Sequence, residues 1–174
     1  TLFEALALSL RDAGVEEIGL FYLGESFLCG WLEEAVGFAK HVAKFPYVFL
    51  TTNGSLAEPS RVEALMAAGL DSLKFSFNYA DLAQFADVTG VKPSLYFSMI
   101  DNIRAAGAIR AKHGFKTGRY AAYIECDGEQ GEKMRAAIDQ IRSCVDEVYA
   151  LPLYSQAEFV GAKGRANGWN VTAG

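Results

Sequence analysis

The residues of this chain that could do chemistry stand directly after short apolar runs. Gly24 and Glu25 follow the apolar stretch 19–23. A short apolar run that ends at a glycine is typical of a buried strand, and the glycine lets the backbone bend or approach a ligand closely. Glu25 is therefore either a ligand-binding carboxylate at a strand end or a cap for the helix expected to begin near Trp31.

Polar side chains recur at the ends of the other predicted strands. They carry hydroxyl, amide and carboxylate groups, on Thr51, Thr52, Asn53, Ser76, Asn78, Glu125 and Tyr154. In parallel α/β folds, ligands bind at the carboxyl ends of the strands. These groups would converge on one mouth, able to hold an ammonium, a carboxylate or ribose hydroxyls. Taken singly, Asn53-Gly54 also fits an ordinary turn, and Ser76 a satisfied core hydroxyl.

The apolar pattern predicts strands that alternate with helices. Predicted strands span 19–23, 47–52, 73–78, 120–125 and 145–153, and predicted helices span 1–13, 31–42, 60–69, 95–114 and 134–141. Ser60 and Glu63 have the spacing of a capping box. The stretch before Pro93 is predicted to be a lid-like loop of about a dozen residues. Aromatic residues near the first two strands are expected in the core, not as a stacking platform: Phe21, Tyr22, Tyr47 and Phe49.

Alternation of strands and helices implies right-handed βαβ units and a parallel sheet. Within 73–78, the apolar side chains Leu73, Phe75 and Phe77 share one face, and Lys74, Ser76 and Asn78 share the other. An open parallel sheet covered by helices on both faces would be apolar on both. The polar face therefore favours a barrel that holds a polar ligand, with the apolar set against the helices.

Composition excludes several classes of protein. The chain has 174 residues, 51% of them hydrophobic, and a net charge of −5, so it lacks the basic surface typical of nucleic-acid binding. No apolar run is long enough to span a membrane. Its three cysteines, Cys29, Cys126 and Cys144, have neither disulfide-framework nor metal-ligand spacing. We therefore expect a reducing, cytoplasmic setting without nucleic-acid or membrane partners.

The ends of the sequence indicate a piece of a longer protein. It begins inside a helical pattern without an initiator methionine and ends in the glycine-rich stretch 161–168. We predict a barrel domain over 1–154 and, over 155–174, a linker toward a further region.

The order of the motifs resembles that of radical S-adenosylmethionine (radical SAM) enzymes. Gly24-Glu25 after an apolar strand is similar to the GGEP motif of that family, and Thr52-Asn53-Gly54 is similar to its TNG. The stretch 69–78 resembles the GLD and SID segment, and 88–91 and 101–103 resemble the region after that segment. The agreement in order covers about 100 residues, although no single motif is specific.

The resemblance implies a partial (β/α)6 TIM-like barrel whose first strand is absent from this chain. It implies S-adenosylmethionine bound beside a [4Fe-4S] cluster, whose reduction yields a 5′-deoxyadenosyl radical that abstracts hydrogen from a substrate. By motif, Glu25 would hold the methionyl ammonium with backbone near Gly24. Ser76 and Asn78 would face the ribose or carboxylate, and Asn53 would shape the pocket floor. Glu125 is a second polar contact predicted from its position alone.

The chain also departs from the pattern of the family. Leu23 and Ser26 replace the first glycine and the proline of GGEP, and the CxxxCxxC cluster loop would lie upstream of Thr1, so no metal ligand or catalytic residue is assigned here. An arginine of relatives is missing near Val88, and Lys74 is a possible substitute for carboxylate binding. The resemblance implies an electron donor such as flavodoxin or ferredoxin and an unknown small-molecule or peptide substrate, with a peptide-modifying (SPASM-type) tail as one option. The alternatives are a degenerate, non-catalytic barrel that serves as a scaffold, and an ordinary (β/α)8 enzyme for a sugar phosphate or nucleotide.

Overall fold

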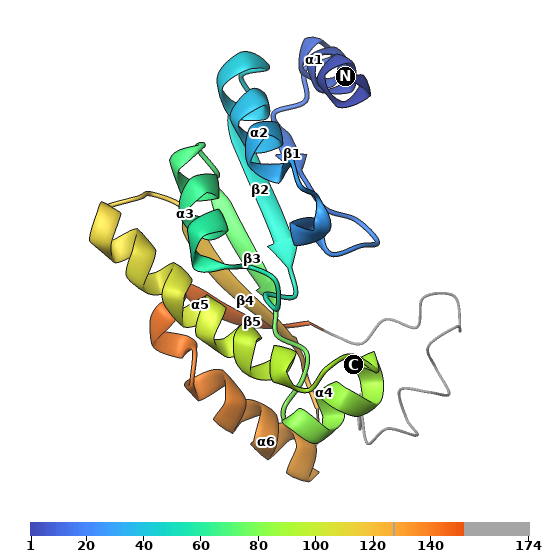
Figure 1. Ribbon diagram of the computed structural model, residues 1–174, viewed down its shortest axis with the longest axis vertical. Coiled ribbons are helices and arrows are strands. Elements are labelled where there is room, and N and C mark those ends of the chain that lie inside the picture. Colours follow the sequence, from blue (N-terminus) through green and yellow to red (C-terminus); the bar gives the residue numbers. More distant parts are fainter. Residues whose placement is uncertain (127, 152–174) are drawn as a thin grey trace.

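The computed structural model describes residues 1–126 and 128–151 and contains one five-stranded parallel sheet (Figure 1). The strands are β1 (Glu17–Gly19), β2 (Tyr47–Thr52), β3 (Ser72–Ser76), β4 (Gly118–Ile124) and β5 (Glu147–Leu151). They pair in chain order, each with the next, and every pair is parallel. A doubly wound sheet starts near its centre and reverses direction. Strictly consecutive pairing is the pattern of a (β/α) barrel, so the predicted α/β, TIM-like partial barrel is confirmed.

Helices connect the strands and cover one face of the sheet (Figure 1). They are α1 (Leu2–Asp12), α2 (Leu32–Gly37), α3 (Pro59–Ala67), α4 (Leu82–Thr89), α5 (Ser94–His113) and α6 (Gly128–Asp139). Helix α2 continues as a π-helical turn, η2 (Phe38–Val42), and 3-10 turns form at η1 (Ser26–Leu28) and η3 (Arg142–Cys144). None of the helices in the described part of the chain has the length and apolarity needed to cross a membrane.

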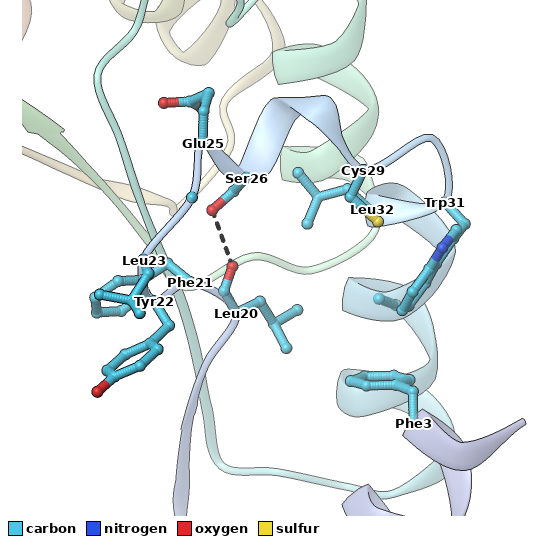
Figure 2. Close-up of a pocket in the computed structure, with 12 residues that line it drawn as sticks. Phe3, Leu20, Phe21, Tyr22, Leu23, Glu25, Ser26, Cys29, Trp31 and Leu32 are labelled. Atoms are coloured by element: carbon cyan, nitrogen blue, oxygen red, sulfur yellow. Dashed lines mark hydrogen bonds between the residues drawn. The ribbon is translucent and has the colours of Figure 1, made fainter.

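The first strand is shorter than predicted and lies earlier in the chain, at Glu17–Gly19 and not at 19–23. Leu20 still donates its N–H to the carbonyl of Phe49 (2.9 Å), but the chain then leaves the sheet. Tyr22 and Leu23 are each 86% exposed and project away from the segment (Figure 2), and Phe21 is 39% exposed. The placement of Phe21 and Tyr22 in the core was therefore wrong, and Tyr47 and Phe49 are only half-buried. An apolar run in the sequence does not show whether its side chains will be covered by the rest of the protein. Here the segment that follows β1 lines a cavity and is not covered by a helix.

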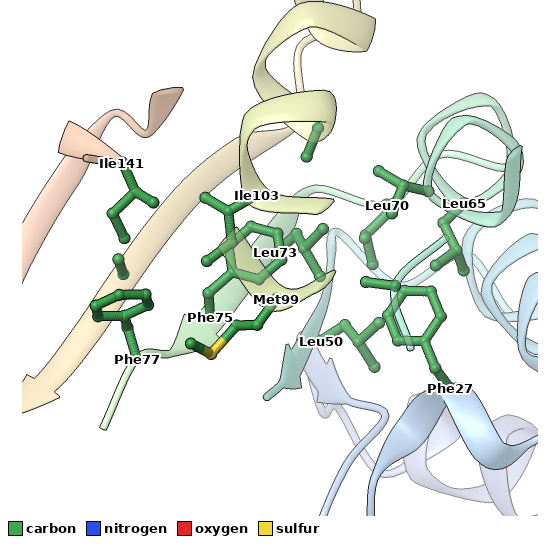
Figure 3. Close-up of a cluster of buried hydrophobic side chains, with 14 of the residues drawn as sticks. Phe27, Leu50, Leu65, Leu70, Leu73, Phe75, Phe77, Met99, Ile103 and Ile141 are labelled. Atoms are coloured by element: carbon green, nitrogen blue, oxygen red, sulfur yellow. The ribbon is translucent and has the colours of Figure 1, made fainter. Parts of the chain in front are cut away.

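The alternation predicted for the third strand is confirmed by burial. Leu73, Phe75 and Phe77 are fully buried, and they pack with α3 and α5 residues such as Leu65, Met99 and Ile103 (Figure 3). Lys74 and Ser76 are only half-buried on the other face. The strand itself ends at Ser76, two residues earlier than predicted. Phe77 adds one more bond, from its N–H to the carbonyl of Ala122 (2.7 Å).

The predicted lid-like loop before Pro93 was wrong, because α4 forms inside it. The Asp81 side chain accepts a hydrogen bond from the N–H of Gln84 (2.8 Å), and Gly90 ends the helix with φ of 64°. The capping box at Ser60 was also wrong. Helix α3 begins one residue earlier, at Pro59, whose missing N–H costs nothing at the first helical position.

Candidate functional site

The Glu25 side chain connects the loop that follows β1 to the end of β2 by hydrogen bonds. Its Oε1 accepts hydrogen bonds from the N–H of Phe27 (3.1 Å) and the hydroxyl of Thr52 (2.5 Å), and its Oε2 accepts one from the N–H of Asn53 (2.8 Å). The capping prediction for Glu25 is confirmed in part, since it caps a helix, although the helix is η1 and not α2. A carboxylate offers about four acceptor positions, so one remains for a ligand.

Ser26 and Arg61 hold the same loop from two sides. The Ser26 hydroxyl lies within hydrogen-bonding distance of the carbonyls of Leu20 (3.1 Å) and Thr51 (3.2 Å). Arg61, from α3, donates to the carbonyls of Phe27 (2.5 Å) and Cys29 (2.8 Å), and its guanidinium stands 5.2 Å from the Phe27 ring centroid. The loop is therefore fixed by bonds from β1, β2 and α3 together.

Arg61 also pairs with Glu33 at the start of α2. Its Nε donates to one carboxylate oxygen (2.6 Å) and its Nη2 to the other (3.0 Å). This bidentate hydrogen bond lowers the pKa of Glu33, although partial burial opposes the shift. Sequence reasoning missed Arg61, because its partners lie about 30 residues away along the chain and no local motif marks such a contact.

Four of the six predicted site residues line one cavity of about 310 Å³ at the carboxyl end of the sheet. Its lining is formed by residues 21–25, by Thr51, Thr52 and Asn53, and by Ser76. Gly24, Glu25, Asn53 and Ser76 are thus brought together. Asn78 and Glu125 do not line it, and the exposed Glu125 bonds through its N–H to the carbonyl of Leu151 (3.3 Å). Tyr154, which was also expected at the mouth, lies outside the described residues.

The Asn53 side chain is occupied by a turn. Its Oδ1 accepts from the N–H (2.8 Å) and the hydroxyl (2.6 Å) of Ser55, and Gly54 follows with φ of 79°. The turn reading of Asn53-Gly54 therefore holds, and Asn53 contributes to the cavity without a free amide oxygen. Asn102, from α5, stabilises the turn through the carbonyl of Gly54 (2.8 Å).

One polar atom of the cavity lacks a partner. Among the described residues, the buried Thr51 Oγ1 has no hydrogen bond. Buried hydroxyls are normally satisfied, so an orphaned one in a cavity wall is suited to a polar ligand group. The cavity thus pairs an orphaned hydroxyl and the remaining acceptor position of Glu25 with the apolar side chains of Phe21 and Leu23, a combination that fits a ligand such as S-adenosylmethionine.

A second, mostly apolar cavity of about 300 Å³ shares the segment 21–25 with the first (Figure 2). Phe3 and Trp31 form its far wall, and the half-buried Cys29 also lines it. Within residues 1–126 and 128–151, no group of three or more His, Cys, Asp or Glu side chains is placed to hold a metal ion.

Comparisons with known proteins agree with the motif order. No family model matches the chain. In sequence, it is 26% identical over 169 residues to a GTP 3',8-cyclase of Mycobacterium sp. (strain KMS), which covers 95% of this chain and 45% of that protein. The chain therefore spans less than half the length of this curated relative.

Two solved structures share the fold. One is Streptococcus suis SuiB bound to S-adenosylmethionine, with a TM-score of 0.63 and 18% identity over 97% of this chain and 39% of that one. The other is 2,3-dimethylmalate lyase, of the PEP mutase/isocitrate lyase superfamily, with a TM-score of 0.57 and 14% identity over 95% and 59%. At these identities, the structures establish the fold alone.

The chain is thus similar in sequence to a GTP 3',8-cyclase and in fold to SuiB, and both similarities agree with the resemblance to radical SAM enzymes in the order of the motifs.

Proposed function

We propose that the chain is the S-adenosylmethionine-binding part of a radical SAM enzyme. The observation that carries the proposal is the Glu25 carboxylate, bonded to both Thr52 and Asn53 beside a cavity whose Thr51 hydroxyl is unpaired. This geometry joins the two segments that resemble GGEP and TNG, which lie 27 residues apart in the chain. The motif order, the GTP 3',8-cyclase relative and the SuiB fold support the same function.

Gly24, Glu25, Asn53 and Ser76 are proposed to contact S-adenosylmethionine, because they share the cavity. Backbone carbonyls near Gly24 and the remaining acceptor position of Glu25 would receive the methionyl ammonium, and Ser76 would meet ribose or carboxylate. Asn78 and Glu125 are proposed as outer contacts that a bound ligand could reach.

With a [4Fe-4S] cluster whose ligands lie outside this chain, the bound cofactor would supply a 5′-deoxyadenosyl radical for hydrogen abstraction. The residues of this chain would bind and orient it. We further propose an oxidoreductase in the cytoplasm that takes electrons from a flavodoxin or ferredoxin and acts on a small molecule or peptide. The barrel is proposed to extend to residue 154, with 155–174 as a linker; residues 152–174 lie outside the described part.

The proposal is tested by Glu25→Gln in the full-length protein. The uncharged amide removes the attraction for an ammonium, so S-adenosylmethionine binding measured by calorimetry should weaken about ten- to hundredfold. The NH2 group of the new side chain would face the N–H of Phe27 or Asn53, and two donors cannot bond to each other. The variant therefore also loses stability, so its unfolding is measured in parallel. Unchanged affinity in a folded variant would leave Glu25 with its structural role alone.

A further inference from the structure

Thr52 ends β2 with its side chain on the helix face of the sheet. Strand register pairs it with the fully buried Phe75, and only 3% of Thr52 is exposed. The preceding residue, Thr51, pairs with Lys74 on the other side of the sheet. That side also carries Ser76, and we call it the concave face. Because the Thr52 hydroxyl is shielded from water, its hydrogen bonds must come from within the protein.

Two hydrogen bonds fix the direction of the Thr52 hydroxyl. The N–H of Gly54 lies 3.0 Å from Thr52 Oγ1, and Oε1 of Glu25 lies 2.5 Å from the same atom. The N–H can only donate, and an ionised carboxylate can only accept. The single proton of the hydroxyl is therefore directed at Glu25, while Gly54 determines where the hydroxyl stands.

The turn at Gly54 is itself held in place. Gly54 has φ of 79°, and a Cβ there would lie 3.2 Å from the ring of Phe75. Asn102, from α5, donates its side-chain N–H to the Gly54 carbonyl (2.8 Å). The Glu25 carboxylate is thus connected through Thr52 and Gly54 to the core and to α5, and not only to its own loop.

The bond from Thr52 also decides which oxygen of Glu25 is available to a ligand. Oε1 accepts from two donors, the hydroxyl of Thr52 and the N–H of Phe27, whereas Oε2 accepts only from the N–H of Asn53. Each carboxylate oxygen has about two acceptor positions, so the free position is on Oε2. Without the Thr52 hydroxyl, Oε1 would have a free position as well, and two backbone N–H groups alone would hold the carboxylate.

We propose that Thr52 is a positioning residue, which orients the Glu25 carboxylate so that Oε2 receives the ammonium of S-adenosylmethionine. The inference rests on the proposed function and assigns to the same site a residue that acts through Glu25. The Thr52 hydroxyl has both of its partners inside the protein, so it does not itself bind the ligand. A carboxylate that is oriented in advance loses less conformational freedom when the ligand binds, and this preorganisation strengthens binding.

The experiment compares Thr52→Val, which has nearly the same shape without the hydroxyl, with Thr52→Ser, which keeps the hydroxyl, in the full-length protein. Calorimetry measures the binding of S-adenosylmethionine and of its desamino analogue, in which hydrogen replaces the ammonium group. Thr52→Val should bind S-adenosylmethionine about five- to tenfold more weakly and the analogue as before, whereas Thr52→Ser should bind both as the unaltered protein does.

Thr117→Val is the matched control. Thr117 is also 3% exposed and donates its hydroxyl to a carbonyl, that of Leu70 (2.8 Å), but it precedes β4 at the opposite end of the sheet. The control variant should lose stability and bind both ligands as before.

The proposal is overturned if Thr52→Val weakens both ligands equally or weakens neither, or if Thr52→Ser or Thr117→Val causes the same selective loss. If Thr52→Val does not fold, Asn102→Ala takes its place, because it releases the turn at Gly54 from α5. Asn102→Ala should cause part of the selective loss, and unchanged selectivity would overturn the proposal.

A measurement without ligand separates this proposal from the proposed function. If the unaltered protein fails to bind S-adenosylmethionine, the proposed function fails, but hydrogen exchange of the Asn53 amide still tests Thr52. That amide donates to Glu25 Oε2, so it should exchange faster in Thr52→Val and not in Thr52→Ser. Equal exchange in the two variants and the unaltered protein would show that Thr52 does not hold the carboxylate.

Discussion

The two faces of the same sheet differ in what their side chains do. On β3, the side chains toward the helices are fully buried among Met99 and Ile103, whereas Lys74 and Ser76, on the opposite face, are half-buried. Adjacent residues such as Phe75 and Ser76 thus belong to different environments. A strand in a parallel barrel separates stability from ligand binding at the level of single residues. Substitutions on the two faces should therefore be distinguishable by experiment.

The largest effect is expected on the helix face. Phe75→Ala removes a fully buried ring and leaves a cavity, which should lower the free energy of unfolding by about 3–5 kcal/mol. Ser76→Ala is the matched change on the concave face and should alter it by about 0.5 kcal/mol or less. Denaturant unfolding measures both. Equal losses would show that the two faces do not divide the roles.

A smaller effect is expected where the helices meet the site. Arg61→Met removes the bonds to Glu33, Phe27 and Cys29, so the free energy of unfolding should fall by about 1–3 kcal/mol. Amide hydrogen exchange of Phe27 and Leu28 should increase, because the η1 loop loses its anchor. Arg142→Met is the control, since Arg142 forms an exposed pair with Asp139 that contributes little. Slow exchange in Arg61→Met would mean that Glu25 and Ser26 hold the loop without Arg61.

The smallest effect is a dependence of stability on pH. The pKa of Glu33 is lowered in the folded protein by its hydrogen bonds to Arg61, so the ionised carboxylate favours folding. The contribution is complete above the ordinary pKa of glutamate and is lost as the pH falls through the lowered value. Unaltered protein and Glu33→Gln should therefore differ by about 1 kcal/mol at neutral pH and converge in acid. A constant difference in urea unfolding across that range would contradict this assignment.

Local patterns were sufficient for most of the fold. The alternation in 73–78 predicted the buried and exposed faces of β3, and the apolar runs found the other strands to within a few residues. Helix α4 was not predicted, because it is only eight residues long and its main local signal is the cap of Asp81 on Gln84. The site was predicted only in part. Strand ends located Glu25, Asn53 and Ser76, but the network through Arg61 depends on contacts between distant segments, which no local spacing records.

The strictly consecutive pairing of β1 to β5 has a consequence for how the chain is made. During synthesis, each strand leaves the ribosome after the neighbour that it will join, so its docking edge can already be in place. Only the intervening helical segment, which for β3 and β4 comprises both α4 and α5, separates one strand from the next, so no pairing has to wait for a distant part of the chain. The hydrogen bonds of Glu25 and Arg61 can then form as soon as α3 has been made, and α3 is the first helix after β2. The mouth of the site can thus assemble while the second half of the sheet is still being translated.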